Sequence, residues 1–104
     1  MAFWTDVFMN KMRNEWLRRV DKIQYYSNGN WYDAVITNKS VNGNMLKIIS
    51  VTNDNDSMHI TSVRIIDISG DIAGEVNEDI TKTAAQGVIT VWEFPLYEIK
   101  EVSQ

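Results

Sequence analysis

The sequence contains no cysteine, and only one histidine and one proline occur among its 104 residues. Without cysteine, neither a disulfide framework nor a thiolate zinc site can form, so the fold depends on its hydrophobic core. With His59 as the single histidine, histidine pairs are excluded within one chain, and we expect no metal and no cofactor. His59 could join a distant Ser and Asp, but no serine lies in a nucleophile-elbow pattern. We therefore predict a structural histidine and no enzyme.

Long apolar runs are also absent. No charge-free run exceeds ten residues, whereas a membrane-spanning helix needs about 20 apolar residues. The opening "MAFWTDVFMNKMRNE" is interrupted by Asp6, Asn10 and Lys11 and lacks the apolar middle of a secretory signal. We expect no signal peptide, no transmembrane segment and no membrane partner.

Basic residues are fewer than acidic residues. Ten Lys and Arg residues stand against fourteen Asp and Glu residues, which gives a net charge of −4 and argues against nucleic acid as a partner. The charge is uneven, because residues 1–22 hold five basic and three acidic side chains and the remainder holds five and eleven. The N-terminal segment is thus weakly basic on an acidic body.

The length and the 44% hydrophobic residues predict a single domain over 1–104. A helix is expected over 6–20, with Thr5 as its N-cap, because the apolar residues share about half of the helix circumference. These residues are Phe8, Met9, Met12, Trp16, Leu17 and Val20. Phe3, Trp4 and Val7 do not share that face.

From residue 22 to residue 101 the pattern changes to that of an antiparallel β-meander. Asn28-Gly29 and Asn42-Gly43 are strong hairpin signals, and Pro95 indicates an edge, a bulge or a bend in the last apolar stretch. We predict a mainly β (α+β) fold in which the N-terminal amphipathic helix packs on a small antiparallel β-sandwich or barrel of six to seven strands.

Two acidic segments resemble cation sites only superficially. "NDNDS" places Asp54 and Asp56 two residues apart, but the glycine and the glutamate of a calcium loop are missing, so we favour a solvated loop. A second group follows in "DIAGEVNED", where we expect the charges to keep a sheet edge soluble. Its members are Asp71, Glu75, Glu78 and Asp79.

Aromatic residues supply the candidate binding sites. Trp31 and Tyr32, beside the first hairpin, could stack on a sugar together with Trp92 and Tyr97, although core packing also explains most of them. At the chain start, Phe3, Trp4 and Val7 are predicted to be exposed and to contact a protein partner or a second copy. The alternative is that Trp4 folds back on Met9 as a hydrophobic staple.

The order of these features is a short amphipathic helix, "KIQYYSNGNWYDAVI", "ITSVRIIDISGDIAGE" and "ITKTAAQGVITVWEFPLYEI". It resembles small proteins from the tail and baseplate regions of phages and prophages of Gram-positive bacteria. The resemblance implies a non-catalytic structural or accessory protein of a virion tail, found in the virion or the host cytoplasm, with other copies or tail proteins as partners. Two alternatives stay open: a carbohydrate-binding module that uses Trp31 and Tyr32, and a phage-encoded inhibitor of a host protein.

Overall fold

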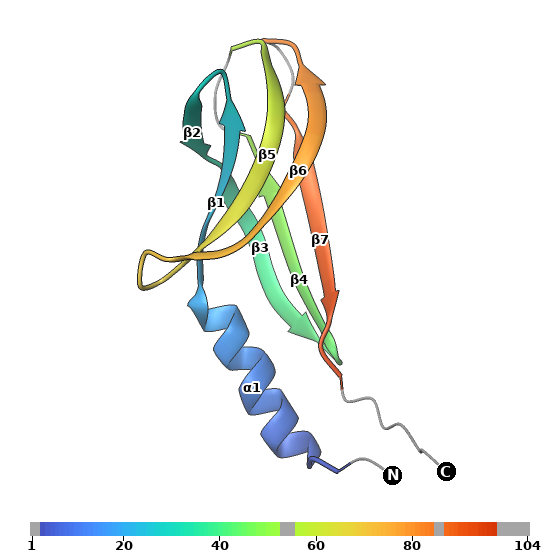
Figure 1. Cartoon of the computed structure of the whole chain (residues 1–104). Helices are drawn as coiled ribbons and strands as arrows, with labels where there is room; N and C mark the ends of the chain where they lie inside the picture. Colours follow the sequence, from blue (N-terminus) through green and yellow to red (C-terminus); the bar gives the residue numbers. More distant parts are fainter. Residues whose placement is uncertain (1–2, 53–55, 85–86, 98–104) are drawn as a thin grey trace, which may run out of the picture.

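The computed structural model of the chain describes residues 3–52, 56–84 and 87–97. The molecule is elongated, with extents of 53 × 30 × 23 Å, because one helix continues beyond a pair of β-sheets (Figure 1). The fold is mainly β, as predicted: an N-terminal helix packs on two antiparallel sheets of four and three strands. The sheets form an open sandwich, and the barrel alternative is wrong.

Helix α1 spans Asp6–Arg19. The Thr5 hydroxyl caps it by accepting a hydrogen bond from the backbone N–H of Phe8 at 3.2 Å. Asp6 in the first turn and the arginines in the last turn complement the helix dipole. The helix ends one residue before the predicted boundary, because Val20 already has extended backbone and begins the first strand.

Within the described residues, seven strands follow the helix and divide between two sheets. They are β1 Val20–Ser27, β2 Asn30–Asp33, β3 Val35–Asn42, β4 Met45–Val51, β5 Met58–Asp67, β6 Ile72–Lys82 and β7 Ile89–Pro95. The strand order is β2-β1-β5-β6 in one sheet and β3-β4-β7 in the other. The continuous meander that we expected over 22–101 does not form, because the chain changes sheets between β2 and β3, between β4 and β5 and between β6 and β7. Ala34 makes the first crossing, and its N–H donates to the carbonyl of Ile23 at 2.8 Å.

The two Asn-Gly signals form hairpins of different kinds. Asn28 and Gly29 have φ angles of 55° and 85°, the positive pair that a type I′ turn requires, and they join β1 to β2. In the second hairpin the loop between β3 and β4 is Gly43-Asn44, one residue later than the expected Asn42-Gly43. Only Gly43 has a positive φ there, at 64°, which matches a turn with glycine at its first central position.

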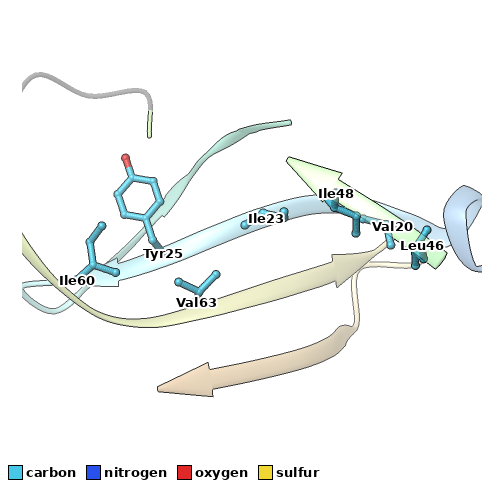
Figure 2. Packing of buried hydrophobic residues seen from close by; sticks show 7 residues of the cluster. All are labelled: Val20, Ile23, Tyr25, Leu46, Ile48, Ile60 and Val63. Carbon is cyan, nitrogen blue, oxygen red and sulfur yellow. The ribbon is translucent and has the colours of Figure 1, made fainter. Parts of the chain in front are cut away.

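The core lies between the two sheets. Its buried side chains come from β1, β4 and β5 (Figure 2): Val20, Ile23, Tyr25, Leu46, Ile48, Ile60 and Val63. They alternate along β4, and the three-residue spacings from Val20 to Ile23 on β1 and from Ile60 to Val63 on β5 fall at irregularities in the strand pairing. One face of each sheet therefore turns inward. Pro95 ends β7, which is an edge strand of the three-stranded sheet, so the predicted edge position of the proline is confirmed.

Candidate protein-binding surface

Helix α1 turns only a narrow face toward the rest of the molecule. Met9, Arg13 and Leu17, four residues apart, are partly buried, and Leu17 packs against the core. The guanidinium Nε of Arg13 donates to the backbone carbonyl of Leu96, just after β7, at 2.9 Å. No residue of the helix is fully buried. Along most of its length the helix therefore faces the sheets with this row of side chains, and Arg19 adds a contact at its C-terminal end.

A second row of apolar side chains faces solvent, formed by three residues of α1 and by Trp4, which precedes the helix by two residues. Trp4, Phe8, Met12 and Trp16 are also four residues apart and are 46%, 39%, 42% and 58% exposed. We call these four residues the helix stripe. The rings of Trp4 and Phe8 stack with centroids 4.8 Å apart, and Phe3 contacts Trp4 edge to face at 4.9 Å.

The exposure of the helix stripe corrects the sequence-based expectation, which placed Phe8, Met12 and Trp16 against the sheet. Each of them precedes a member of the partly buried row by one residue, and one residue corresponds to about 100° of rotation around a helix. Because Met9, Arg13 and Leu17 make the contact, the stripe is rotated away from it. The apolar half of the helix is thus shared between an inner row and an exposed row.

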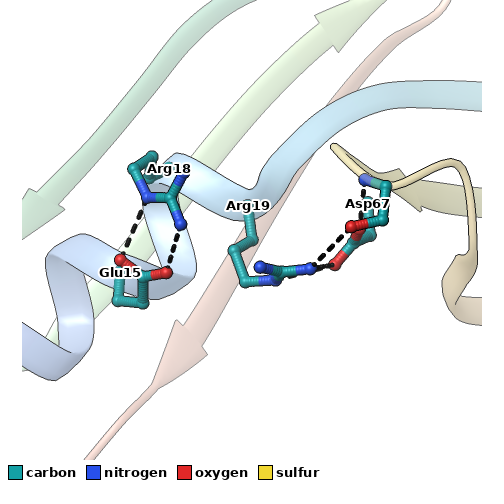
Figure 3. Close-up of polar contacts among 5 residues, drawn as sticks. Glu15, Arg18, Arg19 and Asp67 are labelled. Atoms are coloured by element: carbon teal, nitrogen blue, oxygen red, sulfur yellow. Dashed lines mark hydrogen bonds and ion pairs between the residues drawn. The ribbon is translucent and has the colours of Figure 1, made fainter.

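Polar contacts fix the C-terminal end of the helix to the turn between β5 and β6 (Figure 3). Arg19 Nε donates to Asp67 Oδ2 at 2.8 Å, and the N–H of Ile68 donates to the Arg19 carbonyl at 3.0 Å. The backbone N–H of Ser69 bonds Asp67 as well and, with the neighbouring Arg19, holds the pKa of this carboxyl below its usual range. The helix is therefore held at Arg19 and again at Arg13.

The helix stripe runs into an open cleft of about 320 Å³ between the two sheets. Its lining includes Trp16 and Val20 at the helix end, Leu46, Ile48, Trp92 and Phe94 from the second sheet, and Val63, Ile65, Ala73, Gly74 and Val76 from the first. Trp16 belongs to both the stripe and the cleft. Because Trp16 and Val76 are 58% and 43% exposed, the cleft is open to solvent. We call it the intersheet cleft.

The intersheet cleft exists because small residues of β6 face large residues of β7. Val63 on β5 is buried, and Ile65, two residues later, lies on the same inward face of the sheet. Gly74 of β6 is paired with Ile65, so its position also lies on the inward face. A Cβ built on Gly74 would meet no atom within 4 Å. Opposite, the rings of Trp92 and Phe94 stack at 6.1 Å, and the buried Nε1 of Trp92 has no hydrogen-bond partner among the described residues.

The sequence-predicted partner-binding residues lie at the free end of the helix. Phe3 and Val7 are 79% and 67% exposed, and Trp4 is part of the helix stripe. The ring on which Trp4 stacks is that of Phe8, whereas the staple alternative paired Trp4 with Met9. Sequence periodicity did not identify Phe8, Met12 and Trp16 as surface residues, because the pattern does not say which part of a wide apolar arc makes the contact.

Trp31 and Tyr32, the candidate glycan-binding pair, point to opposite faces of β2. Tyr32 stacks on the buried Tyr25 at 5.6 Å and packs against the core. Trp31 lies beside Tyr26 on the outer face of the sheet, with ring centroids 4.9 Å apart. The Arg64 guanidinium carbon is 3.9 Å from the centroid of the Trp31 ring. The two predicted residues therefore do not share one platform.

The other aromatic candidates divide between the cleft and the surface. Trp92 is partly buried and packs against the core, whereas Tyr97 is 53% exposed.

The polar candidates do not converge on one point in the described part of the chain. His59 Nε2 contacts the Asp79 carboxylate across β5 and β6, and both side chains are exposed. No group of three or more His, Asp or Glu side chains there could hold a metal ion. The carbonyl of Asp56 accepts a hydrogen bond from the buried Lys82 at 2.6 Å, and Asp54 lies outside the described residues.

Comparison of the chain with protein-family models, with curated proteins and with solved structures finds no match in any of the three. In the segments that the structure covers, no helix has the length and apolar character needed to cross a bilayer. The helix stripe and the intersheet cleft are therefore the features of this chain that bear on its function.

Proposed function

We propose that this chain is a non-catalytic structural or protein-binding module that acts as an accessory component of a phage tail or baseplate. The observation that supports protein binding is the continuity of the helix stripe with the intersheet cleft. Contiguous exposed apolar patches usually mark contact sites, and aromatic residues dominate the energetics of protein interfaces. The layout resemblance described above supports the phage setting.

The rigid attachment of the helix favours binding. Bonds from Arg13 and Arg19 hold α1 at two points, so its apolar stripe is presented in a fixed direction. A preorganised surface loses less conformational freedom when it binds than a mobile one. We assign Trp4 and Phe3 to the contact, together with the rest of the stripe, and place Val7 at its rim, about 100° further around the helix.

Glycan binding is the second candidate function. It is favoured by the outer face of the four-stranded sheet, where the Tyr26–Trp31 pair lies beside a hydrogen-bonded row of polar side chains. In this row Gln24 donates to Asp33 at 2.7 Å, and Arg64 donates to Gln24 at 2.9 Å. Against it, Arg64 covers one face of the ring on which a sugar would stack. A Trp31→Ala variant that lost binding to an immobilised cell-wall glycan would establish this function.

The test of the proposed function compares exposed apolar residues on and off the helix stripe. We expect a Trp4→Ser, Phe8→Ser double variant to lose association with itself or with purified tail proteins encoded beside it, measured by sedimentation velocity over a range of concentrations. The matched control is Ile72→Ser, which removes an apolar residue of β6 that is 55% exposed and does not line the cleft. Equal association of the double variant, the control and the wild type would contradict protein binding through the helix.

A phage-encoded inhibitor would use the same surface for a host protein. Genes for tail proteins beside this one favour the assembly role, whereas neighbouring early or defence genes favour inhibition.

A further inference from the structure

We propose that the partner of the helix stripe is the same stripe of a second copy of this chain. The two α1 helices pack antiparallel about a twofold axis, and Trp4 of each copy closes the mouth of the other copy's intersheet cleft. This inference rests on the proposed protein-binding function and names its partner.

The spacing of the stripe makes it self-complementary. In an antiparallel pair centred near position 10 of both helices, Trp4 lies opposite Trp16 and Phe8 lies opposite Met12. Each contact then occurs twice, as a twofold interface requires. Rows of side chains four residues apart are also the ridges that interlock in the commonest class of helix packing. The stripe therefore pairs large rings at both ends and mid-sized side chains at its centre.

The same register brings Trp4 to the partner's intersheet cleft. Trp16 lines that cleft, and α1 from Asp6 to Trp16 spans about 15 Å at 1.5 Å per residue, with Trp4 two residues beyond it. A ring placed opposite Trp16 meets the apolar walls formed by Trp92 and Phe94. The cleft volume of about 320 Å³ is large enough to accept an aromatic side chain.

The exposed area is sufficient for a specific dimer. With about 200 Å² for a large side chain, the exposed fractions of the helix stripe and Phe3 amount to roughly 530 Å² per copy. Two copies then bury about 1,050 Å², before the cleft walls are counted, and a biological interface needs about 1,000 Å². Full coverage of the helix stripe together with Phe3 is thus close to the required size, and contacts with the cleft walls add to it.

The charge of the three arginines of α1 does not oppose self-association. Arg18 bonds Glu15 of its own helix, and Arg19 bonds Asp67 of its own chain. Arg13 points to the Leu96 carbonyl. The hydrogen bond from Arg18 lowers the pKa of Glu15, so this carboxylate stays ionised beside the arginine. The three arginines of the helix therefore bind within their own chain, and two of them have acidic partners.

Two charge variants test the partner and the register together. Phe8→Glu and Met12→Lys should each raise the dissociation constant of the dimer at least tenfold in sedimentation equilibrium. Mixing the two variants should restore most of the affinity, because in the antiparallel register Glu at position 8 of one copy faces Lys at position 12 of the other. Asn14→Glu, which adds the same charge on the opposite side of the helix, is the matched control and should dimerise as the wild type does.

A third variant tests the cleft without touching the helix. Gly74→Val adds a side chain where no atom lies within 4 Å, and should fill the entrance of the intersheet cleft. We expect an unchanged or slightly higher melting temperature and weaker dimerisation. An unchanged dissociation constant would overturn the docking of Trp4 in the cleft.

The wild-type chain gives the decisive measurement even if a variant fails to fold. A monomer at about 200 µM, which corresponds to a binding free energy weaker than about −5 kcal/mol, would overturn the dimer. Dimerisation without rescue in the mixture would overturn the antiparallel register. If a monomeric wild type still bound a tail protein through the helix stripe, the proposed function would stand and this inference would fail. If stripe variants changed neither kind of association, both would fail.

Discussion

Replacing Trp16 by alanine should separate the stability of the fold from association. The ring is 58% exposed, so of about 250 Å² of tryptophan surface roughly 100 Å² is buried. Alanine retains about a third of this burial, and the lost area of about 70 Å² corresponds to about 1.5 to 2 kcal/mol of unfolding free energy. The open cleft adds no cavity term, because solvent fills the space that the ring leaves. The helical pattern alone, which puts Trp16 on a core face, predicts about 3 to 5 kcal/mol instead.

The control for this prediction is Ile48→Ala. Ile48 is completely buried, so its truncation leaves a closed cavity and should cost about 2 to 5 kcal/mol. Urea unfolding of both variants and the wild type, followed by circular dichroism at about 1 µM protein, keeps association from adding to the apparent stability. A loss above about 3 kcal/mol for Trp16→Ala, or a loss larger than that of Ile48→Ala, would refute the exposed position of the ring.

Three further predictions concern the fold. Acid should weaken the junction of helix and sheet, because Ser69 and Arg19 lower the pKa of Asp67 in the folded state. The ionised Asp67 therefore stabilises the fold fully above the unfolded-state pKa of about 3.9. This stabilisation is lost as the pH falls through the folded-state pKa. The free energy of unfolding in urea should therefore change less between pH 6 and pH 2.5 for Asp67→Asn than for the wild type. An equal change for both would contradict this role of Asp67. Gly29→Ala should cost about 1 kcal/mol or more because φ is 85°, whereas Gly74→Ala, without a positive φ, should cost less. Calcium at millimolar concentration should leave the melting temperature unchanged, and a clear increase in melting temperature would indicate a cation site in the acidic segments.

Local chemistry was sufficient to predict several elements of this fold. The Thr5 cap and the apolar period located α1 to within one residue, because a capping bond and a helical turn involve neighbours only. Asn28-Gly29 formed the predicted turn, since its positive φ angles are a property of those two residues. Pro95 lies at a sheet edge because a residue without an N–H cannot donate to a ladder.

The candidate site was predictable only in part. The sequence indicated exposure at Phe3, Trp4 and Val7, which it placed outside the apolar arc of the helix. It did not indicate the exposure of Phe8, Met12 and Trp16, because these residues have the same periodicity as a buried row. The intersheet cleft could not be foreseen either, since it depends on Gly74 of one sheet facing Trp92 and Phe94 of the other.

The sequence by itself determined the types of elements, the helix to within one residue and the first hairpin turn: a capped helix, then strands punctuated by turns. The pairing of β1 with β5, some forty residues apart, was decided only in the tertiary structure, as was the change of sheet at Ala34. Tertiary contacts also determined which row of α1 faces the sheets, because Arg13 and Arg19 form hydrogen bonds to distant parts of the chain. The physical reason is that propensities and turn angles act between neighbouring residues, whereas strand partners and helix orientation follow from how the complete set of apolar faces can be buried together.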